Sequence, residues 1–153
     1  MTENIKQSLH QSLLHAILYY NDELNEEQGG FIVKIRNKEE YRFIPIRNSN
    51  TGTPTALVLY TADVAEFNEK IAMPMLDGEW SVYASFHTHP KGMRALPSSR
   101  DLTELFTSFA TNYIYAPGKE LNMFDYNAKP EFGCYNWNTS NIMTFNGFKP
   151  IIK

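Results

Sequence analysis

Two histidines near the middle of the chain have the spacing of metal ligands. His87 and His89 are separated by one residue within Val82 to His89, a stretch predicted to form a strand. Because successive side chains alternate between the faces of a strand, both imidazoles should point to the same side. Pro90 cannot continue a central strand, so the chain must turn there. The loop that follows is expected to return a carboxylate, Asp101, toward the histidines.

Two imidazoles and one carboxylate make three protein ligands for a divalent metal ion. Zinc held by three protein groups keeps a fourth position for water, which is the arrangement of catalytic zinc rather than of closed structural sites. Such zinc lowers the pKa of its water to about 7. The pattern therefore predicts metal-assisted hydrolysis at neutral pH. Paired core histidines that bind no metal are the structural alternative.

The stretch around these ligands resembles the signature of the JAMM (JAB/MPN) metalloprotease family. That signature has a distant Glu, then His-Ser/Thr-His-Pro, a loop, and Ser-x-x-Asp. Thr88, Pro90 and Ser98 stand at the remaining positions of the signature in this chain. Eight residues separate His89 from Ser98, one more than is usual in the family. Loops tolerate such insertions, and the resemblance implies that the two histidines and the aspartate bind Zn²⁺.

The resemblance also implies two catalytic residues outside the ligand set. Glu27, just before a Gly-Gly pair that leads into a predicted strand, matches the distant glutamate and would be the general base. Glu26 and Glu23 compete for this role. Ser98 would donate a hydrogen bond to the oxyanion of the tetrahedral intermediate. Ser98-x-x-Asp101 before an apolar helical run is also a helix-capping pattern, and one residue can serve both roles.

From this resemblance we expect a zinc-dependent hydrolase that cleaves a peptide or isopeptide bond. Its substrate would be a protein or peptide, and a conjugate of a ubiquitin-like protein is one option. Two alternatives stay open, namely a catalytically silent JAMM-like binding module and a bacterial toxin-associated JAMM-like domain. The filled ligand positions favour the enzyme, whereas residues 113–118 and 124–126 are faintly similar to toxin-linked domains.

The elements that must position these residues follow from hydrophobic periodicity. An apolar helical stripe predicts a helix over residues 3–20, with His10 and His15 facing solvent. A second helix over residues 62–73, with Val64 turned inward, should end at the Met-Pro-Met-Leu-Asp-Gly stretch that begins at Met73. Further helical spacing predicts a helix over residues 100–111. Predicted strands cover residues 31–35, 41–46, 55–60, 82–89, 113–115 and 121–126, followed by short strands or ordered loops.

This order of elements matches the JAMM fold. The resemblance implies an α/β (α+β) fold in which a mixed central sheet is flanked by an N-terminal helix and two further helices, with cytidine-deaminase-like layering. We expect residues 1–153 to form a single domain, because a chain of this length can bury one sizeable core.

Composition excludes several classes of function. The net charge of −3 gives no electrostatic footprint for nucleic-acid binding, so no nucleic-acid partner is expected. The apolar runs are too short for a membrane span, and the first residues do not open a signal peptide. A cytoplasmic protein without a membrane partner is therefore expected. The single cysteine, Cys134, cannot form an internal disulfide and is read as a small buried hydrophobic residue.

Overall fold

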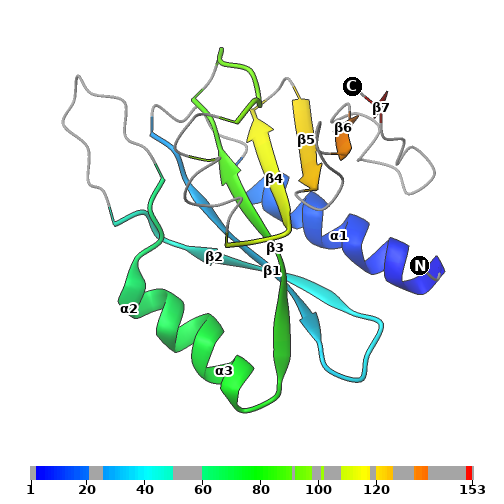
Figure 1. Ribbon diagram of the computed structural model, residues 1–153, viewed down its shortest axis with the longest axis vertical. Helices are drawn as coiled ribbons and strands as arrows, with labels where there is room; N and C mark the ends of the chain where they lie inside the picture. Colours follow the sequence, from blue (N-terminus) through cyan, green and yellow to red (C-terminus); the bar gives the residue numbers. More distant parts are fainter. Residues whose placement is uncertain are drawn as a thin grey trace.

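The central element of the computed structural model is a seven-stranded sheet with the strand order β2-β1-β3-β4-β5-β6-β7 (Figure 1). The structure describes residues 3–20, 26–49, 60–90, 92–97, 101, 108–117, 120–125, 133–137 and 151–152. The strands are β1 Gly29–Ile35, β2 Tyr41–Ile46, β3 Trp80–Thr88, β4 Thr111–Ala116, β5 Glu120–Asp125, β6 Gly133–Trp137 and β7 Ile151–Ile152. Strands β3 and β4 run parallel, and all other neighbours run antiparallel. The predicted mixed sheet is confirmed.

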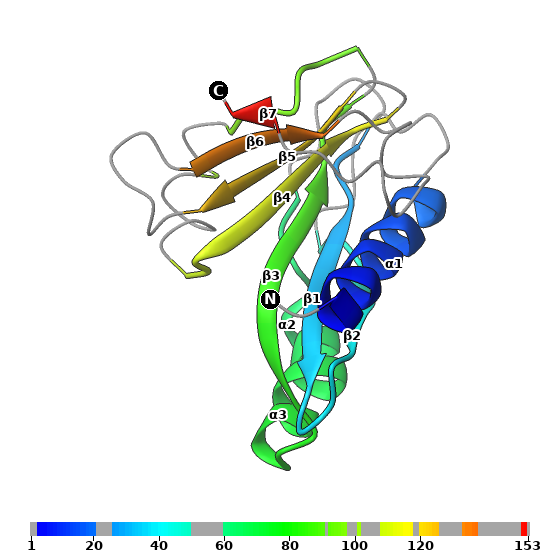
Figure 2. The same ribbon diagram turned by 90° about the vertical axis from the view of Figure 1, so that its right-hand side faces the viewer.

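Helix α1, Glu3–Tyr19, covers one face of the sheet (Figure 2). Its apolar stripe packs on side chains of β1, β2, β3, β4 and β5, as the periodicity predicts. The buried members of the stripe are Leu9, Leu13, Ala16, Ile17 and, just after the helix, Tyr20. His15 is exposed as expected. His10, in contrast, is only 4 % exposed, so the expectation that it faces solvent is wrong. A position at the edge of an apolar stripe is buried when the neighbouring sheet is wide enough to cover it.

The opposite face of the sheet is covered by a second helical segment. It comprises α2 Val64–Phe67, a π-helical turn Asn68–Ala72 (η1) and α3 Met73–Leu76. The predicted break at Met73 is wrong, because the helical chain continues through Pro74 to Leu76. Proline is tolerated in the first turn of a helix, and Pro74 lies in the first turn of α3. Val64, expected to face inward, is 71 % exposed, because it begins the helix beyond the edge of the core.

An irregularity in the pairing of β1 with β3 changes which face of the sheet the first side chains of β3 occupy. The pairing shifts between Ile32 and Val33, so that Tyr83 of β3 is passed over in the register. A bulge of this kind reverses the alternation of side chains. Tyr83 therefore packs with Ala84 on the α1 side, and Val82 lies on the α2 side, opposite to the faces that strict alternation over Val82 to His89 would give them. Downstream of the bulge the predicted alternation holds.

The other predicted elements are either confirmed or lie mostly outside the residues that the structure describes. The hairpin of β1 and β2 and the strands β4 and β5 are confirmed. Of the strand expected over residues 55–60 only Tyr60 is described, and residues 102–107 of the last predicted helix lie outside the described residues. Within the described part of the chain, no helix is both long and apolar enough to span a membrane.

Candidate metal centre

The end of β3 places two imidazoles side by side. His87 lies within the strand and pairs in register with Gly29 of β1. His89 follows directly after the strand, where its backbone N–H donates to the carbonyl of Tyr115 over 2.9 Å. The two ring centroids are 5.1 Å apart, and both side chains are buried. Neighbouring strands on both sides of β3 thus fix the backbone that carries the imidazoles.

The carboxylate of Asp101 lies between these two rings. Its Oδ1 is 3.2 Å from Nε2 of His87, and its Oδ2 is 3.3 Å from Nε2 of His89. Asp101 is itself 6 % exposed. The structure therefore brings together the three residues that the sequence suggested as metal ligands.

Glu27 joins them from the segment that precedes β1. The backbone N–H of Gln28 donates to Oγ1 of Thr88 over 2.9 Å, and the N–H of Thr88 donates to the carbonyl of Gln28 over 2.7 Å. This double link ties the segment to the end of β3. The backbone N–H of Tyr60 donates to Oε1 of Glu27 over 3.1 Å, and Oε2 lies 4.0 Å from Nε2 of His89. One carboxylate oxygen is thus held by backbone while the other reaches the histidines.

The neighbouring glutamate is directed elsewhere. Oε1 of Glu26 accepts a hydrogen bond from Nε2 of Gln28 over 2.6 Å, and this side chain is only half-buried. Glu23 lies outside the described residues. Among the glutamates that the structure describes in this segment, only Glu27 belongs to the cluster.

Tyr60 forms a wall of the site, although no pattern in the sequence predicts it. Its ring lies nearly parallel to that of His87, with 9° between the planes and 6.4 Å between the centroids. Its hydroxyl donates to the carbonyl of Ile46 over 2.9 Å. A Cβ at Gly29 would lie 2.8 Å from the Tyr60 ring and 2.5 Å from the carbonyl oxygen of Phe86. Only glycine permits this close approach. These contacts join segments that are distant in the sequence, so no local sequence pattern predicts them.

The hydrogen bond at Nδ1 of His89 determines which ring nitrogen is available to a metal. Nδ1 is 2.9 Å from the carbonyl oxygen of Arg94. A carbonyl can only accept, so Nδ1 must carry the proton, and Nε2 of the neutral ring keeps its lone pair. Burial lowers the pKa of His89, but the hydrogen bonds to Asp101 and to the Arg94 carbonyl, with the charge of Glu27, outweigh burial and raise it.

The donor set fits a divalent metal ion. One ligand atom from each of the four buried residues Glu27, His87, His89 and Asp101 lies within 4.8 Å of the others. Two buried carboxylates require compensating positive charge. Neither ring nitrogen of His87 has a hydrogen-bond partner among the described residues, although Nε2 lies 3.2 Å from Asp101 in an ion-pair contact. Imidazole nitrogens and carboxylate oxygens are the groups that zinc binds in catalytic sites.

Comparison with known proteins assigns the chain to a family. Residues 10–129 match the family described as prokaryotic homologs of the JAB domain. The chain belongs to this family. The matched range contains all four clustered residues, and it confirms the resemblance noted for the sequence signature.

A solved structure shows the same fold for this JAB-domain protein. The solution structure of protein DSY2949 from Desulfitobacterium hafniense has a TM-score of 0.51 and 18 % sequence identity, over 75 % of this chain and 81 % of that chain. This likeness concerns the fold alone. No curated protein matches the chain significantly.

Ser98, the predicted oxyanion donor, lies outside the described residues, as does most of the predicted helix that it would cap. Both of its roles in this JAB-domain protein stay predictions.

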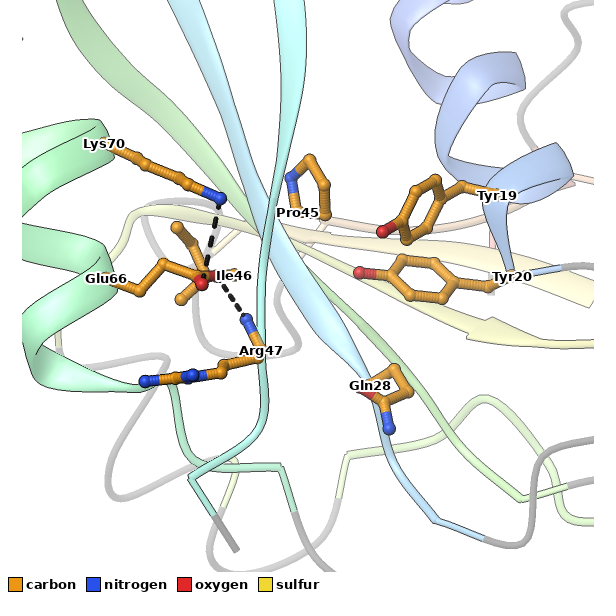
Figure 3. Close-up of a pocket in the computed structure, with 8 residues that line it drawn as sticks. All are labelled: Tyr19, Tyr20, Gln28, Pro45, Ile46, Arg47, Glu66 and Lys70. Carbon is orange, nitrogen blue, oxygen red and sulfur yellow. Dashed lines mark hydrogen bonds and ion pairs between the residues drawn. The ribbon is translucent and has the colours of Figure 1, made fainter.

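A hollow of about 230 Å³ lies between the end of α1, β2 and α2 (Figure 3). Its charged groups have partners: the Glu66 carboxylate lies 3.7 Å from Nζ of Lys70 and accepts the backbone N–H of Arg47, and Nε of Arg47 lies 3.3 Å from Oδ2 of Asp63. None of the four clustered residues lines it. The hollow is therefore separate from the metal centre.

Proposed function

We propose that this JAB-domain protein is a zinc-dependent hydrolase that cleaves a peptide or isopeptide bond in a protein or peptide substrate. The observation that carries the proposal is the placement of Glu27. Its carboxylate shares a buried cluster with His87, His89 and Asp101, yet one of its oxygens is already engaged by the backbone of Tyr60. A residue held in this way is suited to transfer a proton beside the metal rather than to complete the ligand set.

In this proposal the two histidines and Asp101 hold zinc. Zinc held there would supply an activated water and polarise the scissile carbonyl. Glu27 accepts the proton from the attacking water and later delivers it to the leaving amine, a contribution typically worth ~10²–10⁴ in rate. The N–H of Tyr60 keeps the carboxylate oriented between these two transfers. Ser98 is proposed to donate a hydrogen bond to the oxyanion.

The substrate class rests on the family. The JAMM resemblance suggests an amide bond at the C-terminus of a ubiquitin-like protein, and hydrolysis of such conjugates is the proposed assay. A silent binding module would instead bind its partner without any turnover.

The metal site is tested by metal analysis of protein purified without chelator. We expect about one zinc ion per chain, because the four buried groups form one cluster. The double variant His87→Ala, His89→Ala should lose the zinc, since it removes two of three ligands. Unchanged zinc content in the folded double variant would contradict the site.

The general base is tested by Glu27→Gln, with Glu26→Gln as the matched control. Glutamine keeps the size of glutamate and can still accept the N–H of Tyr60, but it cannot take up the proton. Turnover should fall by about 10²–10⁴ at matched zinc content, whereas Glu26→Gln should be nearly silent. If Glu26→Gln is the inactive variant instead, Glu26 rather than Glu27 is the general base. If neither change affects an active enzyme, Glu23 becomes the candidate.

A further inference from the structure

A single peptide group joins His89 to a buried carboxylate on a neighbouring strand. The carbonyl of Arg94 accepts from Nδ1 of His89 over 2.9 Å, and the N–H of Ala95 donates to Oε2 of Glu120 over 2.8 Å. This carbonyl and this N–H belong to the same planar peptide unit, in which they point in opposite directions. The hydrogen bonds therefore form a continuous chain from the imidazole through the peptide to the carboxylate.

Strand β5 holds this peptide firmly. Glu120, the first residue of β5, is 7 % exposed. Its carboxylate also accepts hydrogen bonds from Nε of Arg94 over 2.9 Å and from Nη2 of Arg94 over 3.2 Å. Asn122 is two residues further along the strand, and its Nδ2 donates to the carbonyl of Ala95 over 2.8 Å. Ala95 is fully buried against Ile114 and other side chains of β4 and β5. The loop between the metal ligands is thus attached to β5 at successive backbone groups.

A carboxylate on the N–H of a peptide strengthens the carbonyl at its other end as an acceptor, because hydrogen bonds in a chain polarise one another. A stronger acceptor at Nδ1–H makes the opposite nitrogen, Nε2, a better metal ligand. Metal-binding histidines commonly donate their second N–H to a carboxylate or a backbone carbonyl for this reason. Here Nδ1 of His89 donates to a backbone carbonyl, and the N–H of the same peptide donates to a carboxylate.

We propose that Glu120 is a positioning residue for the metal ligand His89, acting through the Arg94–Ala95 peptide. The proposal rests on the proposed function in that His89 is taken to bind zinc. The negative charge of Glu120 fixes the proton on Nδ1 of His89 and increases the basicity of Nε2. Asn122 holds the carbonyl of Ala95, in the next peptide unit, and so limits movement of the residue whose N–H donates to Glu120.

The test compares Glu120→Gln with Glu66→Gln as a matched control. Glutamine at position 120 can still accept the N–H of Ala95, so the loop geometry is kept while the charge is lost. Glu66 also accepts a backbone N–H and pairs with a cation, Lys70, but this carboxylate lies in the hollow outside the metal centre (Figure 3). Affinity for zinc alone is measured by competition with a chelator. Glu120→Gln should raise the dissociation constant about tenfold, and Glu66→Gln should leave it unchanged.

A second measurement observes the hydrogen-bond chain directly. In zinc-loaded protein labelled with ¹⁵N in its histidine rings, Nδ1 of His89 should carry a proton whose resonance moves upfield in Glu120→Gln and stays in place in Glu66→Gln. A merely structural role of Glu120 would lower the melting temperature without moving this resonance. An unprotonated Nδ1 in the unsubstituted protein would overturn the proposal without any variant.

The outcomes separate this proposal from the proposed function. If Glu120→Gln binds zinc as tightly as the unsubstituted chain, the positioning role of Glu120 is wrong, whatever the enzyme hydrolyses. If the unsubstituted chain hydrolyses nothing but the dissociation constants differ as expected, the hydrolase proposal fails and the positioning role stands. A chain that binds no zinc contradicts both.

A second variant serves if Glu120→Gln does not fold. Glu120→Asp keeps the negative charge but shortens the reach of the carboxylate to the N–H of Ala95. Zinc affinity of Glu120→Asp equal to that of the unsubstituted chain would again overturn the proposal.

Discussion

Side chains of the metal centre are oriented in two different ways. Glu27 and His89 each have one polar atom held by backbone, namely Oε1 by the N–H of Tyr60 and Nδ1 by the carbonyl of Arg94. His87 has no such partner among the described residues, and the parallel ring of Tyr60 lies beside it instead. Hydrogen bonds therefore orient the proposed general base and one proposed ligand, whereas packing orients the other proposed ligand.

Ser98 is the residue whose two predicted roles a single substitution can separate. If Ser98 donates to the oxyanion, Ser98→Ala should lower turnover by about 10²–10³ with little change in melting temperature. If it only caps the following helix, the same change should lower the free energy of unfolding by about 0.5–2 kcal/mol and leave turnover per folded molecule intact. We expect the first result. Amide hydrolysis and thermal unfolding of the same preparation distinguish the two roles.

At the scale of elements, the site depends on how closely β1 approaches β3. Gly29 is the first residue of β1 and lies opposite His87. The segment just before it carries Glu27, and the hydroxyl of Tyr20 donates to the Gly29 carbonyl over 2.7 Å. The spacing of two strands at one residue pair thus decides how far Glu27 lies from His87 and His89.

Gly29→Ala should therefore disturb stability and zinc binding together. The added Cβ would lie 2.5 Å from the backbone oxygen of Phe86, and a backbone atom cannot turn aside as a flexible side chain can. Overpacking of this kind typically destabilises by about 1–3 kcal/mol. We expect a lower melting temperature and weaker zinc binding. Lys34→Ala, on the same strand but away from the site, should change stability by less than about 0.5 kcal/mol. Normal zinc affinity in Gly29→Ala would show that the strand spacing is not critical.

At the scale of the whole molecule, burial of His10 links folding to pH. The imidazole is buried on α1, and burial lowers the pKa of His10 below its ordinary value. Since the unfolded chain then binds the proton more readily, His10 contributes stability above its unfolded pKa of about 6.5 and loses that contribution as the pH falls through its lower folded pKa. Acidification should therefore favour unfolding through this residue.

The pH effect is measured by urea unfolding of the unsubstituted chain and of His10→Gln. Between about pH 7.5 and about pH 5.5 the unsubstituted chain should lose more stability than the variant, because glutamine does not titrate. Groups common to both chains, including His89 with its raised pKa, cancel in this comparison. Equal losses in the two chains would show that His10 is not responsible. Measurements near pH 8, where His10 is neutral in both states, serve as the reference.

The sequence by itself determined the features that depend on local order along the chain. The alternation of β3 places His87 and His89 on one side, the stripe of α1 predicts its buried face, and the signature indicates the family. Each of these follows from a repeat of two or 3.6 residues, or from a fixed spacing, which a linear pattern records.

Only the tertiary structure decided what depends on contacts between distant segments. The position of Glu27, rather than Glu26, in the buried cluster depends on the pairing of Gln28 with Thr88, 60 residues away. The bulge that turns Tyr83 to the other face arises from the register of two strands, and the burial of His10 arises from the sheet that covers α1. The link from His89 to Glu120 crosses a loop and a neighbouring strand. Such contacts form because the sheet brings segments together, and no periodicity within either segment encodes the partner of the other.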